Sequence, residues 1–183
     1  MLFGTETFEF EILNKLHDWL SCDFMDMLMV GVSSLGNGGA IWIVAAIVMM
    51  SIKKYRKCGY VFVLALLAGL VFGNFVMKNL IARPRPCALF EGLELLVSKP
   101  TDFSFPSGHT LASFISAFIL LDVNKKIGIA AMVLAVVMAL SRMYLFVHFP
   151  TDILGGILLA FVIYLLARKF LKKAEQEEQS VQE

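Results

Sequence analysis

Apolar runs long enough to cross a membrane alternate with short polar stretches along most of the chain. The runs cover residues 35–52, 59–77, 103–121, 127–147 and 149–167. A bilayer core of about 30 Å needs about 20 helical residues, so each run can form one transmembrane helix if a few polar residues are allowed at one end. The pattern therefore predicts an all-α, polytopic membrane helix bundle with about five transmembrane helices.

The first 34 residues have a different character. They are rich in acidic side chains, and their apolar residues recur at helical spacing. A helix with one apolar face and one charged face suits the membrane interface. We therefore expect residues 1–34 to form an interfacial N-terminal segment. In an alternative interpretation, residues 24–35 extend the first span as a longer, tilted helix.

The C-terminal end is polar. Its composition predicts a disordered cytoplasmic tail over residues 174–183. No internal repeat divides the rest of the chain, so we expect residues 1–173 to form a single integral-membrane domain.

Short basic stretches predict the orientation of the bundle. They lie between or after the spans, at Lys53–Lys57, Asn124–Lys126 and Arg168–Lys173. In a chain with five spans all three lie on the same side, which the positive-inside rule assigns to the cytoplasm. The N-terminus and the opposite ends of the spans then face the extracellular or periplasmic side.

The composition agrees with a membrane location. Of 183 residues, 58% are hydrophobic and 17% are charged, whereas soluble domains average about 25% charged residues. The mean hydropathy is +0.77. These values exclude a water-soluble domain and predict a multi-pass protein of the cell membrane. The sequence shows no basic stripe of the kind that binds nucleic acid, so we expect no nucleic acid partner.

Polar and ionisable residues remain at the outer ends of three separate segments. They are Lys78, Arg83 and Arg85 after the second run, Pro106–His109 at the start of the third, and Arg142, His148 and Asp152 around the junction of the last two. A charge within a membrane span is costly, so such residues usually have a function. The spacing therefore predicts one polar site at the outer face of the bundle.

Each of these elements also has an ordinary structural interpretation. A lone cation at the end of a span typically extends to the interface, and Pro106–Gly108 is typical of a capped helix start. However, three cations in one outer loop contradict the positive-inside bias. A helix N-terminus binds anions, and His109 in its first turn can give a proton to a leaving oxygen. These features favour an anion site with acid–base chemistry.

His148 and Asp152 are four residues apart around the proline that begins the last run. The carboxylate can fix the tautomer of the imidazole, which leaves the other ring nitrogen as a base or a nucleophile; a structural hydrogen bond is the alternative. A metal site is disfavoured, because Lys78, Arg83, Arg85 and Arg142 would repel a divalent cation. Three fixed cations can instead balance the charge of a phosphoryl group during its transfer. We therefore expect no metal and no cofactor.

Taken together, these residues resemble the three-part signature of the type 2 phosphatidic acid phosphatase superfamily, whose members are integral-membrane lipid phosphatases. The parts are Lys78-x6-Arg85-Pro86, Pro106-Ser107-Gly108-His109 and Ser141-Arg142-x5-His148-x3-Asp152, complete and in order. The stretch LGNGG at residues 35–39 also resembles the N-terminal region of the family. Many bacterial members have six spans, so six is the alternative to the five counted here.

The resemblance implies a role for each residue. His148 would attack phosphorus and form a phosphohistidine, with Asp152 orienting its ring. His109 would protonate the leaving oxygen and later activate water. The phosphoryl oxygens would be held by Lys78, Arg85, Ser107, Gly108 and Arg142. Arg83 lies outside the signature and would have at most a supporting role, and the family works without a metal.

The activity that the resemblance implies is hydrolysis of a lipid-linked phosphate or diphosphate at the outer face of the membrane. Candidate substrates are undecaprenyl diphosphate, phosphatidylglycerol phosphate, phosphatidate, diacylglycerol pyrophosphate and lipid A, and the compact chain favours the first. One alternative is a phosphotransferase that moves the phosphoryl group to a lipid or sugar hydroxyl. Another is a lipid-phosphate binder or carrier without catalytic activity.

Overall fold

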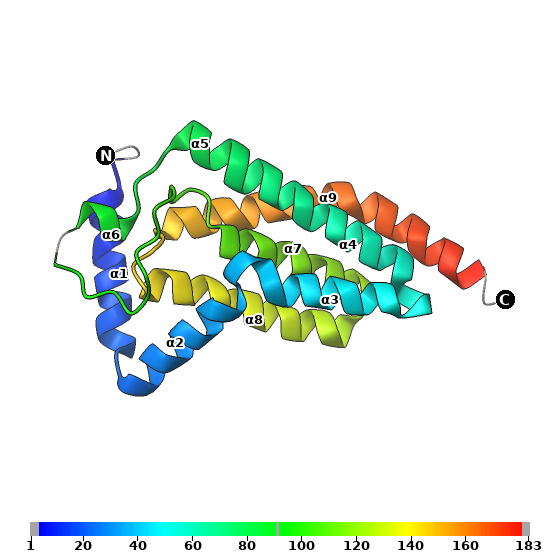
Figure 1. The fold of residues 1–183 in the computed structure, drawn as a ribbon, viewed down its shortest axis with the longest axis horizontal. Coiled ribbons are helices and arrows are strands. Elements are labelled where there is room, and N and C mark those ends of the chain that lie inside the picture. The colour runs from blue at the N-terminus through cyan, green and yellow to red at the C-terminus, as the bar shows by residue number, and fades with distance from the viewer. Residues whose placement is uncertain (1–3, 91, 181–183) are drawn as a thin grey trace.

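The computed structural model describes residues 4–90 and 92–180, and most of them are helical (Figure 1). The helices are α1 (Glu6–Leu20), α2 (Asp23–Leu35), α3 (Ala40–Ser51), α4 (Arg56–Gly69), α5 (Lys78–Ile81), α6 (Pro86–Leu89), α7 (Gly108–Val123), α8 (Lys125–Tyr144) and α9 (Pro150–Ser180). Three short segments join some of them: η1 (Asn37–Gly39), η2 (Lys53–Tyr55) and the π-helical η3 (Leu70–Met77). The described residues include no strand, and the predicted all-α membrane bundle is confirmed.

Helix α7 lies at the centre of the bundle, with α4, α8 and α9 packed around it (Figure 1). Leu111, Ile115 and Ile119 recur at intervals of one helical turn and are all buried. The connection to α8 is tight, because a Cβ added at Gly128 would lie 2.3 Å from the Cα of Leu121. Glycine at this position therefore lets α7 and α8 approach each other closely.

In the described part of the chain, three helical segments are long and apolar enough to cross a membrane: Lys53–Leu89, Lys125–Tyr144 and Pro150–Lys172. Helices α2 and α3 satisfy the same criterion only as a pair, with a bend of 47° between them. Helix α7 is apolar but has 16 residues, fewer than any of these three candidate spans. The count of five spans therefore stays a prediction.

The bend between α2 and α3 agrees with the alternative interpretation, in which residues 24–35 extend the first span. With 12 residues, α3 alone reaches about 18 Å, which is too short to cross the bilayer. At the bend, Gly38 and Gly39 have φ values of 61° and 72°. Only glycine adopts this left-handed conformation without a steric cost, so the glycines of LGNGG allow the bend.

Helix α1 crosses the end of the bundle instead of running along it (Figure 1). It is buried on one side only, since Leu13 is fully buried while Trp19 is 83% exposed. This one-sided burial is typical of an amphipathic helix. The interfacial position of the N-terminal segment stays a prediction.

Helix α9 continues well beyond the apolar run, to Ser180. Residues 174–180, the first part of the tail predicted to be disordered, continue this helix in the structure. They contain Ala, Glu and Gln, which are good helix formers and follow an existing helix without a break. The remainder of the predicted tail, residues 181–183, lies outside the described residues.

The two ends of the bundle carry different kinds of residue (Figure 1). The turn η2, the connection between α7 and α8, and the C-terminal part of α9 lie at one end, and they contain the basic stretches. The first turns of α7 and α9 face the other end, and the first turn of α9 is bonded to Glu9 of α1. The predicted site is thus at the end of the bundle opposite to the basic loops.

Candidate active site

A cavity of about 980 Å³ lies at this end of the bundle. Six of the eight predicted site residues line it: Lys78, Arg85, Gly108, His109, Arg142 and His148. The other two, Ser107 and Asp152, are fully buried. They lie side by side, since the N–H of Ser107 donates to the backbone carbonyl of Asp152 at 3.1 Å. The structure therefore brings the three parts of the signature together.

His148 lies in the turn between the end of α8 and the start of α9. The backbone N–H groups of Val147 and His148 both donate to the carbonyl of Arg142 at 3.2 Å, which ties the turn to α8. Helix α9 begins at Pro150, whose fixed φ suits the first position of a helix. The local sequence thus places His148 one short turn before the helix that carries Asp152.

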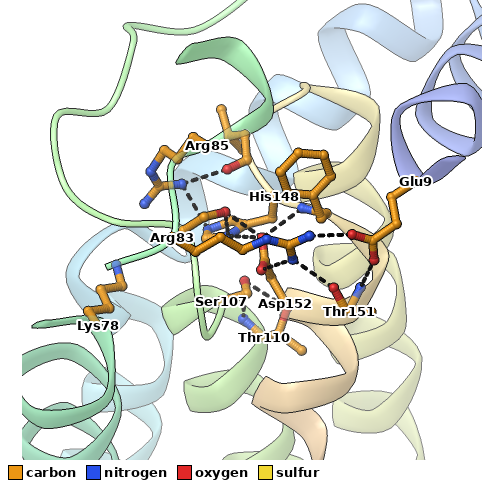
Figure 2. Close-up of polar contacts among 12 residues, drawn as sticks. Glu9, Lys78, Arg83, Arg85, Ser107, Thr110, His148, Thr151 and Asp152 are labelled. Atoms are coloured by element: carbon orange, nitrogen blue, oxygen red, sulfur yellow. Dashed lines mark hydrogen bonds and ion pairs between the residues drawn. The ribbon is translucent and has the colours of Figure 1, made fainter. Parts of the chain in front are cut away.

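The imidazole of His148 is buried, and Asp152 lies against one of its nitrogens (Figure 2). Nδ1 of His148 is 3.5 Å from Oδ2 of Asp152. The same carboxylate oxygen accepts a hydrogen bond from the Ser104 hydroxyl and one of 2.7 Å from the N–H of Phe149. These donors hold the carboxylate in place beside the ring.

Arg85 contacts the other nitrogen of the same ring. Its Nη1 lies 3.0 Å from Nε2 of His148 and donates to the carbonyl of Val147 at 2.7 Å. Because a guanidinium can only donate, Nε2 must be the acceptor and carries no proton. The proton of the neutral ring is then on Nδ1, facing Asp152, and the lone pair of Nε2 faces the cavity side with Arg85.

The protonation state of His148 fits this arrangement. Burial of the ring is the main effect that lowers the pKa of His148, and the positive charge of Arg85 adds to it. Together they outweigh the hydrogen bond and charge of Asp152 and lower this pKa to about 3. The ring is therefore neutral at physiological pH. A neutral imidazole is the form that can act as a nucleophile.

Asp102 forms ion pairs with two of the predicted phosphate-binding cations. Nη2 of Arg85 donates to its Oδ1 at 2.8 Å, and Nζ of Lys78 bonds its Oδ2. Burial alone would raise the pKa of Asp102, but the hydrogen bonds and charges of Lys78 and Arg85 outweigh burial and lower it to about 2. Asp102 is thus a carboxylate anion on the wall of the cavity.

Ser107 caps the start of α7, as its position in the sequence suggests. Its Oγ accepts hydrogen bonds from the N–H and the hydroxyl of Thr110, at 3.4 and 2.9 Å. A Cβ at Gly108 would lie 2.7 Å from Oδ1 of Asn74, so a larger residue there would displace the Asn74 side chain. Gly108 also lines the cavity, and without a side chain its backbone is accessible to a ligand there.

His109 and Arg142 both contact the region of the bend between α2 and α3. Nε2 of His109 lies 3.1 Å from Oδ1 of Asn37, a residue of the LGNGG stretch. Nη1 of Arg142 donates to the Ser33 hydroxyl, while its buried Nε has no hydrogen-bond partner among the described residues. The N-terminal region therefore helps to position two of the predicted site residues.

Arg83 lies behind the cavity wall, fully buried against Asp152. Its Nη1 donates to Oδ1 of Asp152 at 2.7 Å, and its Nη2 forms an ion pair with Glu9 of α1 (Figure 2). Its guanidinium also lies 4.1 Å from the centre of the Phe149 ring. Arg83 thus contacts the predicted orienting carboxylate directly.

Several polar residues of this site were not identified from the sequence, among them Glu9, Asn37, Asp102 and Ser104. The glycines around Asn37 and the position of Ser104 just before Pro106–His109 were the available signals. Glu9 gave no signal, because an acidic residue on an amphipathic helix is ordinary.

The charges of the site favour an anionic ligand. Lys78, Arg85 and Arg142 line the cavity together, and Asp102 is the carboxylate that pairs with two of them. In the part of the chain that the structure describes, no group of three or more His, Cys, Asp and Glu side chains is arranged to hold a metal ion. The donor set thus fits a phosphoryl group better than it fits a divalent cation.

A membrane helix bundle with a cationic cavity next to a buried His–Asp pair defines an integral-membrane protein with an anion site. Residues 56–176 match the PAP2 superfamily, and the chain belongs to that superfamily. The family resemblance read from the three-part signature is thereby confirmed, and so is the predicted class of enzyme, a lipid phosphate phosphatase.

Two relatives match nearly the whole chain. An undecaprenyl-diphosphatase of Sulfolobus acidocaldarius is 32% identical and aligns with 96% of this chain and 88% of its own length. Phosphatidylglycerophosphatase B of Bacillus subtilis is also 32% identical and aligns with 92% of this chain and 86% of its own length.

Two crystal structures share the fold. A transmembrane PAP2 type phosphatidylglycerolphosphate phosphatase from Bacillus subtilis superposes with a TM-score of 0.75 at 29% identity, over 93% of this chain and 88% of that one. LpxE of Aquifex aeolicus superposes with a TM-score of 0.74 at 25% identity, over 87% of this chain and 94% of that one.

Proposed function

We propose that this protein hydrolyses a phosphate or diphosphate carried by a membrane lipid, through a phosphohistidine on His148. The observation that carries the proposal is the distance of 3.0 Å between Nη1 of Arg85 and Nε2 of His148. It places a cation that can hold a phosphoryl oxygen next to the ring nitrogen that has a lone pair. A phosphoryl group held by Arg85 would therefore lie within reach of attack.

In the first step, a bond forms between Nε2 of His148 and phosphorus while the bond from phosphorus to the lipid-side oxygen breaks. The imidazole gains positive charge, and the carboxylate of Asp152 next to Nδ1 stabilises that charge. His109, which lines the same cavity, gives a proton to the leaving oxygen. A lipid monophosphate leaves if the substrate is a diphosphate, and a lipid alcohol leaves if it is a monophosphate.

In the second step, water attacks the phosphorus of the phosphohistidine. The bond from oxygen to phosphorus forms as the bond from nitrogen to phosphorus breaks, and His109 takes the proton of the water. Inorganic phosphate leaves, and His148 returns to its neutral form. Phosphoryl transfer needs positioning and charge stabilisation more than covalent help, and the cavity supplies both.

The proposal assigns the phosphoryl oxygens to Lys78, Arg85, Arg142 and the first turn of α7 with Ser107 and Gly108. Fixed cations stabilise the charge of the transferring group without the reorganisation that water would need. With three cations in place, the proposed reaction uses no metal.

The apolar part of the cavity supports a lipid substrate. Ile43 of α3, Leu66 of α4 and Leu111 of α7 line the same cavity as the cations, so a phosphate head and an apolar tail can be bound together. The relatives are named for undecaprenyl diphosphate and phosphatidylglycerol phosphate. We propose undecaprenyl diphosphate as the first substrate to test and phosphatidylglycerol phosphate as the second.

The proposed site faces the outside of the cell or the periplasm. The basic stretches, which the positive-inside rule places in the cytoplasm, lie at the opposite end of the bundle (Figure 1). Cysteine labelling of single-cysteine variants with a membrane-impermeant reagent tests this orientation, because residues near Leu96 should react from outside and residues near Lys125 should not.

Hydrolysis is tested with the purified protein and three lipids: undecaprenyl diphosphate, phosphatidylglycerol phosphate and phosphatidate, each with EDTA present. We expect release of inorganic phosphate that persists in EDTA, disappears in His148→Ala and is retained in His17→Ala, which removes an imidazole outside the cavity. Release that needs Mg²⁺ and survives His148→Ala would contradict the proposal. A new phosphoester formed when acceptor alcohols are added would instead indicate a phosphotransferase.

A further inference from the structure

Arg83 lies between two carboxylates that come from opposite ends of the chain (Figure 2). Its Nη1 donates to Oδ1 of Asp152 at 2.7 Å, and its Nη2 donates to Oε2 of Glu9. The side chains of Arg83 and Asp152 are 0% exposed and that of Glu9 is 4% exposed. Water is therefore excluded from both ion pairs, and each charge depends on its protein partners.

Glu9 also binds the first turn of α9 directly. Its Oε1 accepts a hydrogen bond of 3.0 Å from the backbone N–H of Thr151, where a carboxylate is favourable because the helix N-terminus is positive. The Thr151 hydroxyl in turn accepts a hydrogen bond of 2.6 Å from Nη1 of Arg83. Helix α1 is thus joined to the turn that carries Asp152 through both oxygens of one carboxylate.

The net charge of the group formed by Glu9, Arg83 and Asp152 affects the charge that the imidazole of His148 can carry. The two oxygens of Asp152 have different tasks, since Oδ1 pairs with Arg83 and Oδ2 lies 3.5 Å from Nδ1 of His148. Arg83 alone would cancel the charge of Asp152, which the imidazole needs when it becomes positive. Glu9 supplies a second carboxylate, so the group of three keeps one negative charge. That charge can stabilise the phosphorylated imidazole.

We propose that Glu9 is a positioning residue of the active site, which acts on His148 through Arg83 and Asp152. The N-terminal helix then contributes to the catalytic apparatus. This inference rests on the proposed phosphohistidine chemistry. It goes beyond that chemistry by giving the first helix of the chain a part in the step at phosphorus.

Glu9→Gln is the test, because it removes the charge and keeps the shape and an oxygen acceptor. With undecaprenyl diphosphate as the probe, we expect kcat to fall about tenfold, the scale on which orienting partners of a functional imidazole act. KM and the Kd for orthovanadate should stay within about twofold, since Glu9 does not line the cavity. Glu11→Gln removes an exposed carboxylate of the same helix and should leave all three values unchanged.

A second measurement needs no turnover. Histidine ¹⁵N spectra of the wild-type protein should show His148 with its proton on Nδ1 only, and Glu9→Gln should show a mixture of tautomers. Arg83→Lys, which keeps the charge but loses the fork of N–H groups, should change both readouts in the same direction. Thermal unfolding in detergent identifies any variant that fails to fold.

The outcomes separate the two proposals. If the wild-type protein releases phosphate and Glu9→Gln matches Glu11→Gln in kcat and in tautomer, Glu9 is only a structural residue and the inference is wrong. An increase in KM with unchanged kcat would also overturn it. If the wild-type protein releases no phosphate but the tautomer of His148 changes in Glu9→Gln, the positioning role holds and the phosphatase proposal is wrong.

Discussion

The carboxylate of Asp102 accepts a hydrogen bond of 2.8 Å from Nη2 of Arg85, where the family signature expects a phosphoryl oxygen. Its other oxygen bonds Nζ of Lys78. The side chain of Asp102 is 54% exposed, so an incoming anion can displace it. A carboxylate of the protein thus competes with the substrate for two of the three cations that are predicted to bind the phosphoryl group.

Replacing Asp102 removes this competitor. We expect Asp102→Asn to bind inorganic phosphate and orthovanadate about fivefold more tightly, the scale of an ion pair that solvent partly screens. Isothermal titration calorimetry measures the change, and Glu94→Gln is the control because it removes an exposed carboxylate from the same connection. Weaker binding in Asp102→Asn would mean that Asp102 positions the cations instead of competing for them.

Asp152→Asn tests the orientation of the imidazole. The amide keeps an oxygen for Arg83, but it cannot hold the proton on Nδ1 of His148 as a carboxylate does. By analogy with other buried carboxylate–imidazole pairs, turnover should fall by up to about 10⁴-fold while orthovanadate still binds. Steady-state kinetics and vanadate titration on a variant with normal thermal unfolding check this. Retained turnover with lost binding would contradict the orienting role.

His109→Ala tests the proton donor. Loss of a general acid should slow hydrolysis of a lipid monophosphate by about 10²- to 10⁴-fold. The effect should be much smaller for p-nitrophenyl phosphate, because its leaving oxygen is stable without a proton. Comparison of kcat/KM for the two substrates gives the answer. Equal losses for both would show that His109 binds the phosphate and does not protonate the leaving group.

The low pKa of His148 predicts how stability depends on pH. The pKa falls from an ordinary value of 6.5 to about 3 in the folded protein. Below pH 6.5 the unfolded chain therefore binds a proton that the folded chain does not, and the free energy of unfolding decreases as the pH is lowered from 6.5 towards 3. Thermal unfolding of His148→Gln in detergent should show a smaller loss between pH 7 and pH 4.5 than the wild-type protein.

Much of the site could be predicted from the sequence because ionisable side chains are energetically costly within a membrane span. Arg142 and His148 stand out among apolar neighbours, and few interpretations other than function account for them. The turn residues at Pro106–His109 have equally definite preferences, and the structure places Ser107 as the cap of α7. Residues whose type does not fit an apolar span, or whose type fits only a turn or a helix cap, can therefore be recognised from the sequence alone.

The supporting contacts could not be predicted in the same way. Glu9 and Asn37 are ordinary where they occur, and their partners lie 74 and 72 residues further along the chain. Arg83 was expected to have at most a supporting role because it lies outside the signature. Its contact with Asp152 depends on the packing of α9 against the loop after α5, which the sequence does not show.

The contact between Arg85 and His148 joins segments that are 63 residues apart in sequence. During synthesis, the first spans enter the membrane long before His148 leaves the ribosome. A nascent chain that ends before His148 therefore contains Lys78 and Arg85 but lacks the proposed nucleophile. The enzyme gains its activity only when biogenesis is complete, and premature termination products would be inert toward the lipids around them.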